Sequence, residues 1–113
     1  IYDQYKTHML CATNRAVGKT FKVLDSVTHI NRGVFSGCKD LEQIDFNGVT
    51  YIDKSSFTNC TSLKEVYIPD SVTYVGEWVF SYCKNLKKIS INKKTFVDKN
   101  AFNECPAEII WRD

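Results

Sequence analysis

The chain has 113 residues, which suits one domain and is short for two. Hydrophobic residues make up 43% of it and charged residues 25%, so the composition is that of a globular domain and argues against wholesale disorder. A net charge of +2 argues against a dedicated nucleic-acid-binding protein, and no apolar run approaches the ~18 residues of a membrane-spanning helix.

A repeat of 22 or 23 residues organises most of the sequence. The gaps between successive cysteines from Cys38 to Cys105 are 22, 23 and 22 residues. A phenylalanine precedes each of these cysteines by three residues, at Phe35, Phe57, Phe80 and Phe102. A leucine follows the first three cysteines at the same distance, at Leu41, Leu63 and Leu86. This period is typical of leucine-rich repeats, in which each copy adds one strand to a parallel sheet.

Each copy is predicted to contain two strands and one helical turn. The first strands are predicted at residues 21–24, 43–46, 65–68 and 88–91. The second, shorter strands are predicted at residues 27–30, 49–52, 72–75 and 95–97. The stretch that ends in Phe-x-x-Cys is predicted to form a helical turn, because residues three apart lie on one face of a helix. The large apolar side chains of all three segments are expected to point inward.

Residues 57–80, with the sequence FTNCTSLKEVYIPDSVTYVGEWVF, carry the most complete copy of the repeat. The recurring Phe-x-x-Cys, the strand after it, Pro69 and the Val-Thr pair resemble the BspA-type leucine-rich repeat of bacterial and protist surface proteins. The resemblance covers about residues 21–105. It implies a leucine-rich-repeat solenoid, built mainly of parallel β-strands with short helical turns.

The whole chain, residues 1–113, is interpreted as a single leucine-rich-repeat domain. Residues 1–20 form an opening cap, repeats occupy about residues 21–105, and residues 93–113 form a degenerate C-terminal cap. Lys94 replaces an expected valine there, and the sequence after Cys105 lacks the leucine, as expected of a terminal repeat. Because the chain begins at Ile1 rather than Met, we expect a mature form or a fragment.

Neither an enzyme nor a cofactor or metal site is predicted. Residues 12–20, ATNRAVGKT, lack the first glycine of a phosphate-binding loop, and a strand follows where that loop requires a helix. His8 and Cys11 are three residues apart, a spacing that places them on opposite sides of a strand and not as a catalytic pair. The cysteines form no Cys-x-x-Cys pair, and the four repeat cysteines are interpreted as free, buried thiols.

Two outward-facing columns of side chains are the candidate binding sites. The first column consists of the residues after each Thr of the second strands: His29, Tyr51, Tyr74 and Phe96. If the coils stack in register, these residues form an exposed aromatic ladder, either a packing stripe or a recognition surface. The second column lies on the first strands and includes Asp45, Glu65 and Tyr67, as either a solvated or a binding face.

The predicted function is non-catalytic binding of another protein, since a solenoid offers an extended surface without a convergent polar site. The resemblance implies an adhesin-like module at the cell surface or outside the cell, with a host-surface or extracellular-matrix protein as partner. Free cysteines fit a cytoplasmic protein equally well, so localisation stays open. The alternative function is purely architectural, as spacer repeats of a longer receptor or enzyme, and self-association through the terminal coil is a third interpretation.

Overall fold

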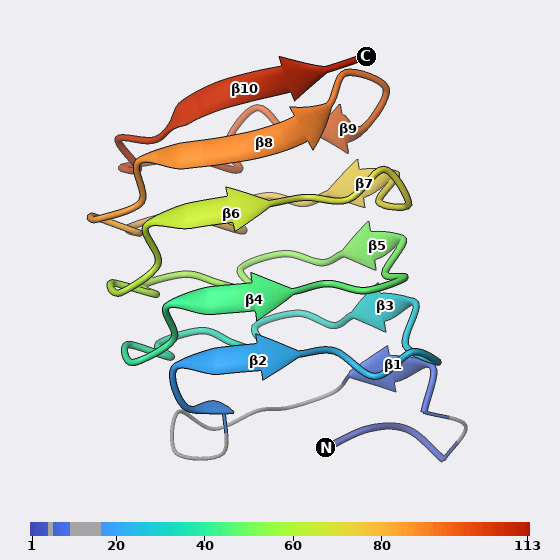
Figure 1. The fold of residues 1–113 in the computed structure, drawn as a ribbon. Coiled ribbons are helices and arrows are strands. Elements are labelled where there is room, and N and C mark those ends of the chain that lie inside the picture. Colours follow the sequence, from blue (N-terminus) through green and yellow to red (C-terminus); the bar gives the residue numbers. More distant parts are fainter. Residues whose placement is uncertain (5, 10–16) are drawn as a thin grey trace.

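The structure, a computed structural model, describes residues 1–4, 6–9 and 17–113. The predictions made for Cys11 and for most of the segment 12–20 therefore lie outside the described residues. The predicted solenoid is confirmed: successive coils of the chain stack in one direction, with parallel strands on two sides of the stack (Figure 1).

The first strands of the repeats form the main-sheet face. They are β2 (Thr20–Lys22), β4 (Gln43–Asp45), β6 (Glu65–Tyr67), β8 (Lys88–Asn92) and β10 (Glu108–Arg112). They form two hydrogen-bonded groups, β2–β4 and β6–β8–β10. The second strands form the ladder face, a five-stranded parallel sheet in the order β1–β3–β5–β7–β9. These strands are β1 (His8–Met9), β3 (His29–Ile30), β5 (Tyr51–Ile52), β7 (Tyr74–Val75) and β9 (Phe96–Val97).

The register of both sheets follows the repeat spacing. Ile30 pairs with Ile52, and Ile52 pairs with Val75, so each apolar column continues from coil to coil. Every strand predicted from the sequence is present, although most are one or two residues shorter than predicted. The strand alternation places one side chain of each short strand in the core and its neighbour outside.

The third side of each coil, here called the turn face, surrounds Phe35, Phe57, Phe80 and Phe102. Each predicted helical turn is a single turn, such as the one closed by the Cys38 N–H donating to the Phe35 carbonyl (3.0 Å). Left-handed backbone recurs two residues before and after most of these phenylalanines, for example at Gly33 and Gly37 (φ 69° and 75°). Such residues cannot continue a right-handed helix. The backbone therefore bonds to the next coil, as when the Phe35 N–H donates to Ser56 O (2.7 Å).

The core is a set of continuous columns through the stack. The rings of Phe35, Phe57 and Phe80 are fully buried and stack with centroids 4.8 and 5.4 Å apart. The thiols of Cys60 and Cys83 are buried beside them and donate to the carbonyls of Phe35 (3.2 Å) and Phe57 (3.1 Å). Cys105 is half-buried, so the prediction that all four repeat cysteines are buried is wrong for this residue. It lies in the last coil, where no further coil covers it.

The C-terminal segment contains a strand that the sequence analysis did not predict. In β10, Ile109 pairs with Ile89 and Trp111 pairs with Ile91, so the main sheet continues beyond β8. Ile89 follows Cys83 by six residues, whereas Ile109 follows Cys105 by four, so the turn before β10 is two residues shorter. That shortening removes the leucine position on which the repeat pattern depended. The role of this segment as a cap stays a prediction.

Gly76 permits close contact between two coils, which predicts a position-specific effect of alanine. A Cβ atom at Gly76 would lie 3.0 Å from the Lys54 backbone nitrogen and 3.3 Å from the Ile52 carbonyl oxygen. Gly76→Ala should therefore lower the free energy of unfolding by roughly 1–3 kcal/mol, the cost of overpacking. Gly48→Ala is the matched control, because a Cβ atom there meets nothing within 4 Å. Equal denaturant midpoints for the two variants would contradict this stacking geometry.

Candidate functional site

The predicted aromatic column exists as a physical stack on the ladder face. The rings of His29 and Tyr51 are 5.2 Å apart, those of Tyr51 and Tyr74 4.5 Å, and those of Tyr74 and Phe96 5.4 Å. All three pairs are stacked, with interplanar angles of 26°, 9° and 11°. His8, which the sequence analysis did not include, extends the column at 4.4 Å from His29. We call these five residues the aromatic ladder.

Threonine side chains hold the ladder strands in register. The hydroxyl of Thr50 donates to the carbonyl of Thr28 (3.2 Å), and the hydroxyl of Thr73 donates to the carbonyl of Thr50 (3.1 Å). The residue after each threonine points to the outside, while the next aliphatic residue, such as Ile52, is fully buried. The Val-Thr pairs of the repeat therefore fix coil-to-coil spacing, and the rings stack because consecutive parallel strands repeat this geometry.

Burial favours the neutral forms of two ladder residues, His29 and Tyr51. Burial lowers the pKa of His29, and the neighbouring His8 lowers it further, although Asp53 acts in the opposite direction. Burial also raises the pKa of Tyr51, with the charge of Asp53 adding to the effect. A neutral imidazole and neutral phenols can each donate and accept hydrogen bonds at the ring edge. The ladder therefore offers apolar ring surface together with a row of polar edges.

The ladder is exposed unevenly along its length. His29, Tyr51 and Tyr74 are half-buried, because each ring is covered by its neighbours in the stack. Phe96, at the last coil, leaves 57% of its surface open. The largest apolar area of the ladder is therefore at its C-terminal end.

The main-sheet candidates do not lie in one sheet. Asp45 is on β4, whereas Glu65 and Tyr67 are on β6, and β4 and β6 belong to different hydrogen-bonded groups. Asp45 and Glu65 are exposed, but the ring of Tyr67 is covered on one side by the Arg112 guanidinium, 4.2 Å from its centroid. Arg112 also donates to Asp70 (2.8 Å) and thereby lowers the pKa of that carboxyl.

Arg112 covers the candidate residue Tyr67, and sequence reasoning missed it because β10 lies outside the repeat spacing. Two further aromatic residues were also missed: Trp78 and Tyr82 are exposed on the turn face. Neither belongs to an apolar column, since the equivalent positions in the first copy are Gly33 and Gly37. Their exposure could not be read from the repeat pattern.

His8 and the buried cysteines Cys60 and Cys83 occupy structural positions. His8 stacks on His29, and its Nδ1 lies 3.4 Å from the Asp3 carboxylate. The Thr7 hydroxyl is in hydrogen-bond contact with both His8 and Asp3. Burial raises the pKa of the Cys83 thiol to about 12, and it raises the pKa of Cys60 well above the usual range. No group of three or more metal-binding side chains occurs among residues 1–4, 6–9 and 17–113. Within the same residues, no helix is long and apolar enough to cross a membrane.

The thiols should react in an order set by burial. Raising the pKa from 9.0 to about 12 reduces the thiolate fraction of Cys83 by roughly a factor of 1000 at neutral pH, so alkylation should be very slow. Among the four repeat cysteines, half-buried Cys105 should react first, and Cys60 and Cys83 last, as followed by peptide mass spectrometry. In denaturant all four should react at similar rates. Equal native rates for Cys83 and Cys105 would contradict the burial described here.

Known proteins resemble this chain in sequence pattern and in structure. Residues 14–110 match the BspA type leucine rich repeat region, in six copies. A leucine-rich repeat protein from Eubacterium ventriosum ATCC 27560 superimposes with a TM-score of 0.79 at 19% identity, covering 98% of this chain and 37% of that one. A leucine rich cell surface protein from Faecalibacterium prausnitzii A2-165 superimposes with a TM-score of 0.76 at 29% identity, covering 84% of this chain and 26% of that one.

No curated protein matches the chain. The two bacterial structures share its stacked, strand-rich coils, and the chain spans about a third and a quarter of their lengths. Leucine-rich repeats of this kind are typically non-catalytic and support a role as a repeat module for protein interaction. Because the repeat pattern covers residues 14–110, the chain belongs to the BspA-type leucine-rich repeat family.

Proposed function

We propose that this chain binds another protein through the aromatic ladder and acts as an adhesin-like module. The observation that carries the proposal is the continuous stack of His8, His29, Tyr51, Tyr74 and Phe96 along one face. Tyrosine and other aromatic residues concentrate at the energetic centres of protein interfaces. A column of aligned rings presents such residues without any rearrangement of the chain.

The composition of the ladder favours a protein partner with an apolar surface. Burial lowers the pKa of His29 and raises that of Tyr51, so these two rings favour their neutral forms near pH 7. Burial of neutral rings avoids the desolvation cost of a charge. The open ring of Phe96 and the half-buried rings of Tyr51 and Tyr74 would form one continuous contact along the ladder.

A location at the cell surface is part of the proposal. The structurally similar protein from Faecalibacterium prausnitzii is described as a cell surface protein, and it shares 29% identity with this chain. A host-surface or extracellular-matrix protein is therefore the partner class to examine first. The chain would present its ladder as one segment of a longer repeat array, since it spans 26% of that relative.

A purely architectural role is the second candidate function. Stacked rings also stabilise the sheet that carries them, and spacer repeats in a longer receptor or enzyme need that stability alone. The coverage of 37% and 26% of the similar structures favours this alternative, because both proteins extend well beyond the part matched here. The two functions predict different results when the rings are removed. The binding function predicts a loss of affinity for the partner, and the architectural function predicts a loss of stability alone.

The double substitution Tyr51→Ser with Tyr74→Ser tests the proposal. Loss of the three ring contacts that Tyr51 and Tyr74 make should lower stability by roughly 0.6–3 kcal/mol, so the variant should still fold. If the ladder is the binding surface, the affinity for a partner from a matrix and host-surface panel should fall by at least ~2 kcal/mol, about thirtyfold. Calorimetric melting and surface binding assays measure the two effects separately.

The matched control is Glu65→Ser with Tyr67→Ser, which changes two residues on the main-sheet face. This control should keep the affinity of the unchanged protein to within a few-fold. If the control loses binding while the ladder variant keeps it, the partner binds the main-sheet face and not the ladder. If the unchanged protein binds no panel member, the architectural role is favoured.

A further inference from the structure

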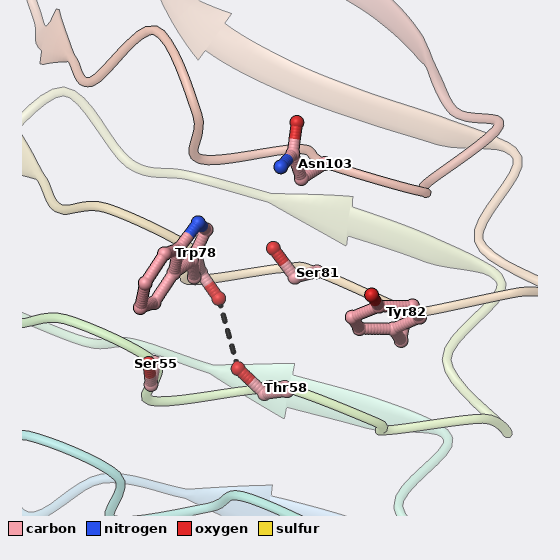
Figure 2. Close-up of a pocket in the computed structure, with 6 residues that line it drawn as sticks. All are labelled: Ser55, Thr58, Trp78, Ser81, Tyr82 and Asn103. Carbon is pink, nitrogen blue, oxygen red and sulfur yellow. Dashed lines mark hydrogen bonds between the residues drawn. The ribbon is translucent and has the colours of Figure 1, made fainter.

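The turn face carries a pocket that lies apart from the ladder and from the main sheet. Its volume is about 310 Å³, and six residues from three consecutive coils line it: Ser55, Thr58, Trp78, Ser81, Tyr82 and Asn103 (Figure 2). This volume is at the lower end of the range of small-molecule sites. It suits a compact ligand and not the edge of a folded protein.

Two aromatic side chains flank the pocket on either side of Ser81 (Figure 2). Trp78 and Tyr82 are 40% and 47% exposed, and both have left-handed backbone with φ of 60°. Bulky residues rarely adopt this conformation, which costs about 1–3 kcal/mol where it occurs. In the first copy the equivalent positions are glycines, Gly33 and Gly37, which adopt it freely. The fold therefore tolerates a costly conformation that projects two rings from this coil.

One contact orients the indole ring. The ammonium of Lys54 lies 4.8 Å from the Trp78 ring centroid, and Glu77 holds that ammonium at 3.3 Å. A cation over the ring face restricts the ring, so the indole is positioned before a ligand arrives. Preorganised rings lose little side-chain entropy on binding.

The floor of the pocket contains a polar group without a partner. Ser81 is 98% buried, and its hydroxyl forms no hydrogen bond with any residue that the structure describes. An unpaired buried hydroxyl costs roughly 1–3 kcal/mol, so its presence calls for a reason. A ligand hydroxyl in the pocket would supply the missing partner.

The remaining lining residues also combine donors with acceptors. The Thr58 hydroxyl donates to the Trp78 carbonyl (2.9 Å), which leaves its lone pairs as acceptors. The Asn103 amide contributes both a donor and an acceptor. No lining side chain is charged. The Lys54 ammonium beside Trp78 is already paired with Glu77, so a phosphate, carboxylate or ammonium ligand would have to break that ion pair to find a partner there.

We propose that this pocket binds a neutral hexopyranose unit of a glycan. A pyranose ring presents a face of C–H groups, which can pack on Trp78 and Tyr82, and a rim of hydroxyls, each a donor and an acceptor. The rim matches Ser81, Thr58 and Asn103. A proline-rich peptide also packs on Trp and Tyr rings, but its backbone offers carbonyl acceptors and no donor at proline. The site is independent of the proposed ladder function.

Saturation-transfer NMR with neutral methyl glycosides tests the proposal, using methyl glucoside, galactoside, mannoside and N-acetylglucosaminide as separate probes. Binding of at least one of them is expected, and the methyl glucuronide should bind at least about tenfold more weakly than its uncharged counterpart. The variants Trp78→Gly and Tyr82→Gly should each reduce the affinity at least about tenfold. Both should fold, because glycine relieves the left-handed backbone, and the melting temperature reports this.

Ser81→Ala tests the contribution of the hydroxyl to binding separately from that of the two rings. It should keep or raise the melting temperature, since it removes an unpaired buried group, and it should weaken the same glycoside severalfold. The exposed Lys64→Ala should change neither quantity. The proposal is overturned if no neutral glycoside binds, if binding is unchanged in Trp78→Gly, or if a hexaproline peptide occupies the pocket in place of the sugars.

Discussion

Phe57→Ala should lower the free energy of unfolding by about 3–5 kcal/mol, the expected cost of a large-to-small change in a packed core. The Phe57 ring is fully buried and stacks between Phe35 (4.8 Å) and Phe80 (5.4 Å), so its loss opens a cavity in the middle of the column. Each coil is stabilised mainly by its neighbours, and this cavity weakens the contact on both sides. Urea unfolding followed by circular dichroism measures the change.

The control for this variant is Lys64→Ala on the main-sheet face. Lys64 is exposed, and an alanine there should change the stability by no more than about 0.5 kcal/mol. If Phe57→Ala and Lys64→Ala unfold at the same urea concentration, the phenylalanine column is not the core of the solenoid.

Removal of residues 93–113 should abolish the soluble monomer. This truncation deletes β9 and β10, which leaves the parallel edge of β8 unpaired and uncovers the buried side chains Ile89 and Ile91. It also removes Phe102, whose ring stacks on Phe80 at 5.9 Å. An unpaired edge beside exposed apolar residues promotes association between chains.

Size-exclusion chromatography with light scattering measures this outcome, with the full chain at the same concentration as reference. Oligomers or loss of soluble protein are expected for the truncated chain. A truncated monomer of unchanged melting temperature would contradict the proposed capping role of the segment. The full chain itself exposes Trp111 (52%) and Ile110 (41%) on β10, so weak self-association of the reference at high concentration is compatible with this account.

The repeat spacing was sufficient to predict the ladder and the core. Tyr51 and Tyr74 follow the same Val-Thr pair in two copies, and a parallel register places them opposite each other, as observed. Phe57 and Cys60 are buried for the same reason, because a repeat position that points inward in one copy points inward in every copy. Periodicity therefore carries information on every residue that occupies a repeated position.

Residues outside the repeated positions could not be predicted in this way. Trp78 and Tyr82 are placed by left-handed backbone on the turn face, a conformation that sequence patterns indicate for glycine and not for aromatic residues. Arg112 covers Tyr67 because β10 pairs with β8 after a turn that is two residues shorter than in the preceding copy. Both features depend on tertiary contacts between coils that a single repeat does not contain.

Hydroxyl-radical footprinting of the tyrosines in the presence of a bound protein partner tests the proposed function most directly. The chain has a tyrosine on each face: Tyr51 and Tyr74 on the ladder, Tyr67 on the main sheet and Tyr82 on the turn face. We expect partner binding to slow the oxidation of Tyr51 and Tyr74 and to leave Tyr67 and Tyr82 unchanged. Protection of Tyr67 or Tyr82, with Tyr51 and Tyr74 oxidised as fast as in the free protein, would contradict the ladder as the binding surface.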